Sequence, residues 1–415
     1  MTRRCFESDD PARPCKPATA MATTTAMANA TSEWPLNRAA LRAYFTALLL
    51  LVACAANANT AAAYKAFNRG DFVAAASAAR PLADAGDPLA LAIMARQARD
   101  GLGMPRDSAQ AKLWAERALP GLRTLVAANN SAAHAHLSFF LNTGLGAEKN
   151  QTEAFKLAEL SAAQGDSGGQ LRLAAHYRSG AGTTLDHNAA NAWYTRAANQ
   201  GNLLAKYQLA LALHKGLGMP KDQAAGAEKI KLIADSGLQF AQYMYAYILR
   251  YGEGVPVDLT GARVWYERSA QQGNSWAQNN LGAMYWNGDG VIANAVIATQ
   301  WYEKSVAQGN AQAQANLSSA YARGIGVAKD NEKSFTLAKL SAAQNHPGGQ
   351  FRLGEAYETG QAAPKDMLQA LTWYRKSAQQ DNTSAKAALK RLTGESAARD
   401  PKAREQWVGA IGNDE

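Results

Sequence analysis

A spacing of 36 residues recurs along most of the chain and restricts the folds that it can adopt. Asp or Asn returns at this interval, with a single step of 43 residues between Asp107 and Asn150. The positions are Asp71, Asp107, Asn150, Asp186, Asp222, Asp258, Asn294, Asp330 and Asp366. A fixed period of about 20 to 50 residues is typical of repeat proteins, in which each unit is one supersecondary element. Nine such units cover residues 71–393.

Each unit has the pattern of two antiparallel helices. Asp and Asn side chains accept hydrogen bonds from the free N–H groups of a first helical turn, so the nine positions predict nine helix starts. Four residues later every unit has a small side chain, and seven residues later most have a bulky Trp or Leu. A glycine then ends the first helix, because glycine readily adopts the left-handed conformation of a C-cap. These glycines are Gly165, Gly201, Gly237, Gly273 and Gly309, and the series continues through Asn345 and Asp381.

The stacking of these units determines the expected architecture. One unit cannot bury both of its apolar faces, so neighbouring units must cover one another. We predict an all-α fold, a right-handed superhelical α-solenoid of about nine 36-residue two-helix repeats. The expected domains are an N-terminal extension and signal peptide (1–53), an N-terminal capping helix (54–70), the repeats (71–393) and a polar C-terminal tail (394–415). Seven extra residues in the second unit lie around Leu119-Pro120-Gly121.

The recurring residues resemble the Sel-1-like repeat family. The resemblance rests on stretches such as A-x-x-W-Y-x-x-S-A-x-Q-G at 262–273 and L-G-x-x-Y-x-x-G-x-G-V at 281–291. It implies a scaffolding, adaptor or peptide- or polysaccharide-assembly role. Bacterial members of the family include envelope lipoproteins and secreted proteins that interact with a host.

The N-terminal region has the layout of an export signal. An apolar run over residues 43–53 follows Arg38 and Arg42, and small residues come after it. Leu51-Val52-Ala53-Cys54 resembles a lipobox, which predicts acylation of Cys54 and a periplasmic or outer-membrane lipoprotein. Cleavage after Ala56-Asn57-Ala58 is the alternative and gives a soluble periplasmic or secreted protein. Met21 or Met27 is a more plausible translation start than Met1, and an uncleaved membrane anchor is a third possibility for this segment.

The sequence has no recognisable catalytic or metal-binding motif. It contains no S-x-x-K, no H-E-x-x-H and no phosphate-binding G-x-x-x-x-G-K-[ST], and the G-x-G pairs recur as repeat turns. His134 and His136 are two residues apart on a predicted helix, a spacing that does not let both bind one ion, and we expect the histidines to lie in solvent or in a groove. We therefore expect a noncatalytic protein without cofactor or metal. The alternative is a cell-wall or β-lactam hydrolase of the cysteine-rich repeat type, which the missing S-x-x-K and the lack of paired cysteines disfavour.

The charge and aromatic patterns bear on the partner. The formal net charge is +9, but the basic residues are dispersed, which allows an acidic envelope glycan or a protein partner and does not favour nucleic acid. We expect contact with a membrane only through a lipid anchor at Cys54.

Aromatic residues are concentrated between residues 243 and 302, with 11 in 60 positions. Five of them occupy positions where neighbouring units often have small or polar residues: Tyr243, Tyr247, Tyr251, Trp276 and Trp286. Aromatic side chains dominate binding hot spots, so these five residues are a candidate partner-binding surface, with Arg250 and Lys215 nearby. Packing between repeats is the alternative explanation, because Leu171, Tyr207 and Phe351 occupy the position of Tyr243 in other units.

Overall fold

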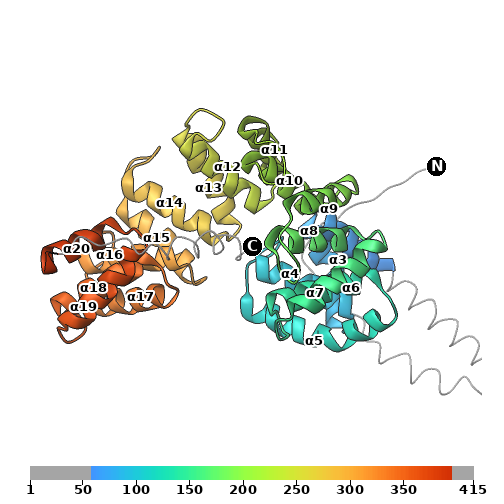
Figure 1. The fold of residues 1–415 in the computed structure, drawn as a ribbon, viewed down its shortest axis with the longest axis horizontal. Helices are drawn as coiled ribbons and strands as arrows, with labels where there is room; N and C mark the ends of the chain where they lie inside the picture. Colours follow the sequence, from blue (N-terminus) through green and yellow to red (C-terminus); the bar gives the residue numbers. More distant parts are fainter. Residues whose placement is uncertain (1–57, 395–415) are drawn as a thin grey trace, which may run out of the picture. The chain divides into compact units, whose positions relative to one another are not determined.

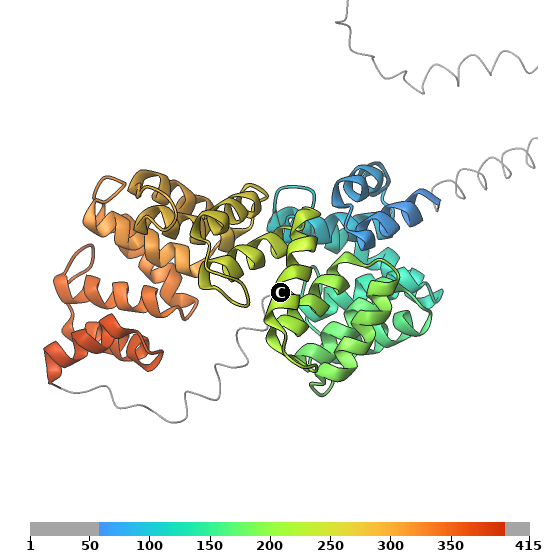
Figure 2. The same cartoon turned by 90° about the horizontal axis from the view of Figure 1, so that it is seen from above.

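The structure, a computed structural model, describes residues 58–394, which contain 19 helices and no strand. Residues 58–69 form a helix that precedes the first repeat. The predicted signal peptide, Cys54 and most of the C-terminal tail lie outside the described residues. Each unit contributes two antiparallel helices, and these pairs follow one another along the chain (Figures 1 and 2).

The two helices of each unit are referred to as helix A and helix B. Helix A is α3 (Phe72–Asp84), α5 (Ser108–Ala127), α7 (Gln151–Ala163), α9 (His187–Asn199), α11 (Gln223–Asp235), α13 (Leu259–Gln271), α15 (Ala295–Val306), α17 (Asn331–Ala343) and α19 (Met367–Gln379). Helix B is α4 (Pro88–Asp100), α6 (Ser131–Thr143), α8 (Ser167–Ser179), α10 (Leu203–Lys215), α12 (Gln239–Tyr251), α14 (Ser275–Asn287), α16 (Ala311–Arg323), α18 (Pro347–Thr359) and α20 (Thr383–Thr393). The predicted all-α solenoid of about nine two-helix repeats is confirmed.

Local sequence signals position the helix ends. All nine predicted Asp and Asn residues are N-caps of helix A, and each side chain accepts a backbone N–H of the first turn. The glycines between helix A and helix B have positive φ, and Asn345 and Asp381 adopt the same conformation at φ of 59° and 63°. The seven extra residues of the second unit lengthen α5 to 20 residues, with Pro120 inside the helix.

The G-x-G turns join the end of helix B to the start of helix A. Gly288 caps α14 in the left-handed conformation, with φ of 81°. Gly290 also has positive φ, and a Cβ there would lie 2.6 Å from the carbonyl atoms of Leu259 at the start of α13. The first glycine therefore ends the helix, and the second permits close backbone approach within the same repeat.

The tyrosine in the W-Y pair is more buried than the tryptophan. Tyr302 is 3% exposed in its repeat, whereas Trp301 is partly exposed and has Lys304 Nζ 4.0 Å from its ring centroid. Tyr194, Tyr266 and Tyr374 are buried to the same extent. The aliphatic stem and charge of the basic residue cover the tryptophan face, an arrangement typical of a cation–π contact.

Two rows of polar side chains connect successive repeats. In five repeats a serine of helix A donates a hydrogen bond to the carbonyl oxygen at the start of the preceding helix B, over 2.7–2.8 Å. The donors are Ser161, Ser269, Ser305, Ser341 and Ser377. A glutamine at the end of helix A bonds to a glutamine 30 residues earlier, as in Gln308 to Gln278 at 2.8 Å. These bonds explain the S-A-x-Q part of the repeated motif.

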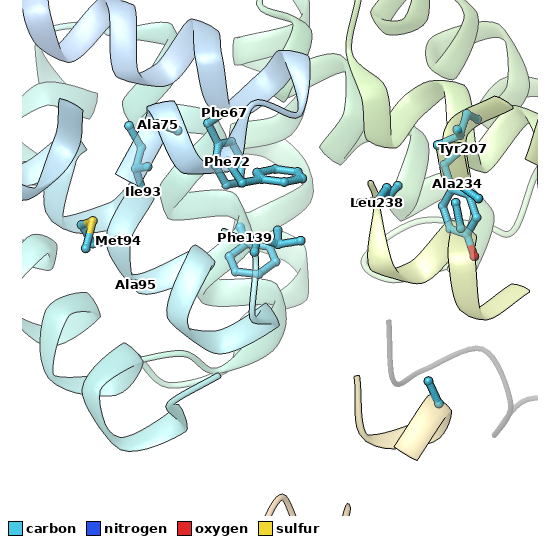
Figure 3. Close-up of a cluster of buried hydrophobic side chains, with 14 of the residues drawn as sticks. Phe67, Phe72, Ala75, Ile93, Met94, Ala95, Phe139, Tyr207, Ala234 and Leu238 are labelled. Carbon is cyan, nitrogen blue, oxygen red and sulfur yellow. The ribbon is translucent and has the colours of Figure 1, made fainter. Parts of the chain in front are cut away.

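Some contacts join units that are not neighbours in the sequence. Gln239 at the start of α12 donates to the carbonyl oxygens of Asp100 and Gly101 at the end of α4, over 2.7 and 3.0 Å. The largest hydrophobic cluster accordingly contains residues of the first repeats and residues of α10–α14. Figure 3 shows part of this cluster, including Phe139 and Tyr207.

Candidate functional site

The five predicted aromatic residues lie on α12 and α14. Tyr243, Tyr247 and Tyr251 are positions 5, 9 and 13 of α12, and Trp276 and Trp286 are positions 2 and 12 of α14. At 3.6 residues per turn, these five positions fall on the same side of helix B. This side is referred to as the helix-B face. The register of the repeats therefore brings the predicted residues to equivalent faces of adjacent units.

Tyr251 and Trp276 are the exposed members of the set. Their side chains are 55% and 48% exposed, values that are high for large aromatic residues. Tyr247 is partly buried, and its ring centroid lies 4.5 Å from that of Tyr251. The two rings, tilted by 48° to each other, present a broad apolar surface at the C-terminal end of α12.

Tyr243 and Trp286 pack against helix A of the following unit. Tyr243 contacts Tyr266 with a centroid separation of 5.8 Å, and Trp286 contacts Tyr302 at 6.3 Å. Both residues are partly buried and lie against hydrophobic clusters. The predicted set therefore combines two exposed rings with three that also contribute to packing.

The charged groups beside the aromatic residues are paired. Arg250 donates to Asp289 over 2.7 Å, and its guanidinium carbon lies 5.6 Å from the ring centroid of Tyr251. Burial, followed by the charge of Glu253, raises the pKa of Tyr247, so this hydroxyl remains protonated and available as a donor. Lys215 is exposed at the end of α10. Because Asp289 already neutralises Arg250, the Arg250 guanidinium is held in this ion pair and does not present an unpaired positive charge to a partner.

Asparagine side chains continue the helix-B face from α14 to α16. Asn280 donates to the hydroxyl of Tyr266 over 3.2 Å, and Asn316 donates to Asn279 over 3.0 Å. Asn279 is fully buried, whereas Asn280 and Asn316 are partly exposed. Amides offer both a donor and an acceptor, so they can pair with a peptide backbone. These asparagines were not predicted as site residues, because Asn279 stands one repeat after Tyr243 without an aromatic ring and the repeat spacing does not indicate its contacts.

The histidines are more buried than the sequence predicts. The expectation that they lie in solvent or in a groove is wrong for His134, His136, His176 and His214, which are at most 3% exposed. They occupy inward positions of helix B, where packing against neighbouring repeats removes them from water. Among residues 58–394 there is no group of three or more His, Cys, Asp or Glu that could hold an ion.

Comparison with protein families agrees with this geometry. A family model described as "Sel1 repeat" matches eight segments of the chain: 88–119, 131–166, 167–202, 203–228, 239–274, 277–310, 311–346 and 347–382. The chain belongs to the Sel1 repeat family. Sel1 repeat proteins are typically protein-interaction scaffolds. The matched segments run from α4 to α19, and the structure adds α3, with its N-cap Asp71, and α20, which together complete the nine helix pairs.

Solved structures with similarity to this Sel1 repeat protein come from several bacteria. A Sel1 repeat protein from Oxalobacter formigenes is 26% identical, with 76% of this chain and 89% of that chain covered and a TM-score of 0.49. A protective antigen of uropathogenic Escherichia coli strains, described as displaying an SLR fold, is 28% identical, with 86% of each chain covered and a TM-score of 0.40. An immunity protein from Pseudomonas aeruginosa is 19% identical, with 53% and 83% covered and a TM-score of 0.36. No curated protein matches the Sel1 repeat chain.

The length and hydropathy of the described helices bear on whether one of them could span a membrane. Between residues 58 and 394, no helix is long and apolar enough to cross a bilayer.

Proposed function

We propose that this protein is a noncatalytic scaffold of the bacterial cell envelope that holds a protein segment on the helix-B face of α12 and α14. The observation that carries the proposal is the exposure of Tyr251 and Trp276 on adjacent units, 55% and 48%. Large exposed aromatic residues are uncommon on free surfaces and frequent in the centres of interfaces. Membership of the Sel1 repeat family supports a protein segment over a glycan as the occupant.

The chemistry of the surface suits an extended polypeptide. Aromatic rings supply contact area with little rotamer entropy to lose, and their polar tips can hydrogen-bond to the main chain. Asn280 on α14 and Asn316 on α16 continue the helix-B face, where they offer amide groups to the same ligand. The contact with Tyr247, whose ring centroid lies 4.5 Å away, restricts the exposed ring of Tyr251, which lowers the ordering cost of binding.

The test separates binding from folding. Trp276→Ala and Tyr251→Ala should weaken partner binding by about 1–3 kcal/mol each, as for hot-spot aromatic residues, and should change the melting temperature little because the side chains are exposed. The wild-type protein and each variant are immobilised and exposed to envelope extract, and the retained partner is then titrated. Leu340→Ala is a matched control, because Leu340 is also 48% exposed but lies on helix A.

Two results would contradict the scaffold proposal for this face. Equal retention of the partner by Trp276→Ala, Tyr251→Ala and wild type would show that the partner binds elsewhere. A large fall in melting temperature for both variants would assign the two rings to packing.

We also propose that the protein is exported and anchored through an acyl group on Cys54. The support is the apolar run that ends in Leu51-Val52-Ala53-Cys54. Each buried CH₂ of an acyl chain contributes about 0.8 kcal/mol to membrane binding, and two chains anchor stably. Cells given a fatty-acid probe should label the wild type and not Cys54→Ala. An N-terminus at Asn59 without label would instead indicate a soluble exported protein.

A further inference from the structure

Three arginine side chains gather around one buried phenylalanine of the N-terminal repeats. Arg96 and Arg99 belong to α4, Arg172 belongs to α8, and Phe139 lies on α6 between them. Their guanidinium carbons lie 4.9, 5.0 and 5.0 Å from the Phe139 ring centroid. Figure 3 shows the Phe139 side chain among the residues of the hydrophobic cluster. Packing of three consecutive helices B thus concentrates positive charge in a small volume.

Arg96 is the deepest of the three and lacks a full set of partners. It is 2% exposed, and its guanidinium is placed between the rings of Phe67 and Phe139, 4.3 and 4.9 Å from the centroids. Its Nη1 lies 3.5 Å from Nδ1 of His136. Its Nε is buried without a hydrogen-bond partner among the described residues, as is the Nε of Arg172. A buried donor without an acceptor is costly and uncommon in native proteins.

The carboxylates near this cluster are already engaged. Asp100 pairs with Arg99 at 3.2 Å. Asp166 is the N-cap of α8, where it accepts the backbone N–H of Gly169 at 2.6 Å and the hydroxyl of Tyr64 at 2.8 Å. Within residues 58–394, Asp100 therefore compensates only one of the three guanidinium groups, and Asp166 is engaged by Gly169 and Tyr64.

The pKa values of Arg96 and His136 are lowered, as expected where the positive charge of the arginines is poorly compensated. Burial, and then the charge of Arg172, lower the pKa of Arg96 to about 9. Burial and the same two arginines lower the pKa of His136 well below its usual range, so its imidazole is neutral near pH 7. An anion brought into this environment would relieve the repulsion and supply the missing acceptors.

We propose that Arg96, Arg99 and Arg172 form a binding site for an oxyanion, a group with two or more negatively charged oxygens such as a carboxylate or a phosphate. The free Nε–H groups point to this chemistry, because a guanidinium binds such groups with two parallel hydrogen bonds, one of which Nε can donate. The site lies on α4, α6 and α8 and goes beyond the aromatic surface of α12 and α14 described above.

Access to the site is through the two outer arginines. The Arg99 side chain is 29% exposed, and Arg172 is partly exposed. Within the described residues no hydrogen bond or ion pair holds Arg172, which rests on the Phe139 ring. Rotation of Arg172 away from this ring would break no polar contact. The oxyanion is then either a free anion or an acidic side chain of a bound protein segment.

The test measures anion binding by the full chain. Inorganic phosphate and a hexaglutamate peptide are titrated separately by calorimetry, with sodium chloride at equal ionic strength as reference, so that general screening is constant. Both probes are expected to bind the wild type, and Arg172→Gln should weaken binding at least tenfold. Arg352→Gln is the matched control and should bind as wild type. Arg352 occupies the same helix position five units later but pairs with Glu355 at 2.5 Å.

The two probes distinguish the sources of the oxyanion. Hexaglutamate binding that phosphate displaces supports a site for an acidic protein segment. Phosphate binding without hexaglutamate binding supports a site for a free anion. Absence of binding by both probes, or equal binding by wild type and Arg172→Gln, overturns the proposal. If Arg172→Gln does not fold, Arg99→Gln is titrated in its place and is subject to the same criteria.

Discussion

Removal of the Ser305 hydroxyl tests whether the serine row stabilises the junctions between repeats. Ser305 is completely buried on α15, and its Oγ donates to the carbonyl oxygen of Ser275 on α14 over 2.7 Å. Ser305→Ala deletes this bond and adds no atom that could clash. Ala197 already stands at the equivalent position of another repeat, so the backbone accepts alanine there.

The expected loss of unfolding free energy depends on whether the Ser275 carbonyl oxygen keeps another hydrogen bond in the variant. This oxygen lies in the first turn of α14, where the helix supplies its own i→i+4 bond. The carbonyl therefore keeps one partner in the variant, and the loss lies near the average net value of a hydrogen bond rather than the full penalty of an orphaned group. We expect about 1 kcal/mol for Ser305→Ala. The corresponding change at Ser269, one repeat earlier, should have a similar effect.

Urea denaturation of wild type and variant measures the loss. Ser179→Ala is the control, because its hydroxyl makes a bond of 2.9 Å to Ala175 within its own exposed helix end, and we expect a change below about 0.5 kcal/mol. A loss at Ser305 no larger than that at Ser179 would refute the argument. So would a gain in stability on combining Ser305→Ala with Ser269→Ala.

Three further changes have defined outcomes. Gly237→Ala should cost about 1–2 kcal/mol in urea unfolding through backbone conformation alone, because φ is 96° and an added Cβ would meet no atom within 4 Å. Ala362→Gly should raise the free energy of unfolding by up to about 1 kcal/mol, because alanine there has φ of 60°. Burial alone would raise the pKa of Glu358, but hydrogen bonds from Tyr374 and Arg391 outweigh it and lower the pKa below its ordinary value of 4.5. The stabilisation from these hydrogen bonds to the Glu358 carboxylate is therefore present above pH 4.5 and is lost as the pH falls through the lowered pKa. Melting curves should show wild type losing more stability than Glu358→Gln between about pH 5 and pH 3.

The helix starts could be predicted because capping is a local interaction. An Asp or Asn side chain reaches only two or three residues along its own chain, so the spacing of these residues was sufficient to place nine helices. The repeated serine and glutamine were visible in the same motif, for example Ser269 and Gln272, but their role was not. Their partners lie 30 residues earlier, and only the stacking of one repeat on the next brings them into contact.

The arginine cluster could not be predicted for a related reason. Arg96 and Arg172 belong to different repeats, and the period of the sequence indicates neither burial nor the direction of a side chain. The helix over residues 58–69 also contributes, since the bond from Tyr64 to Asp166 spans 102 residues. The aromatic set was easier to find, because a local excess of Tyr and Trp is visible without the fold, whereas the split into exposed and supporting rings depends on helix A.

The bonds from Gln239 to Asp100 and Gly101 give the chain an uneven response to tension. Pulling on a solenoid whose repeats contact only their neighbours extends it one repeat at a time from the loaded end. Here the bond to Gly101 closes a loop of 138 residues, which shields the repeats inside it from an applied force until the bond breaks. Under load, α15–α20 would lengthen first and act as an extensible arm, while the segment between α4 and α12 would hold as one block.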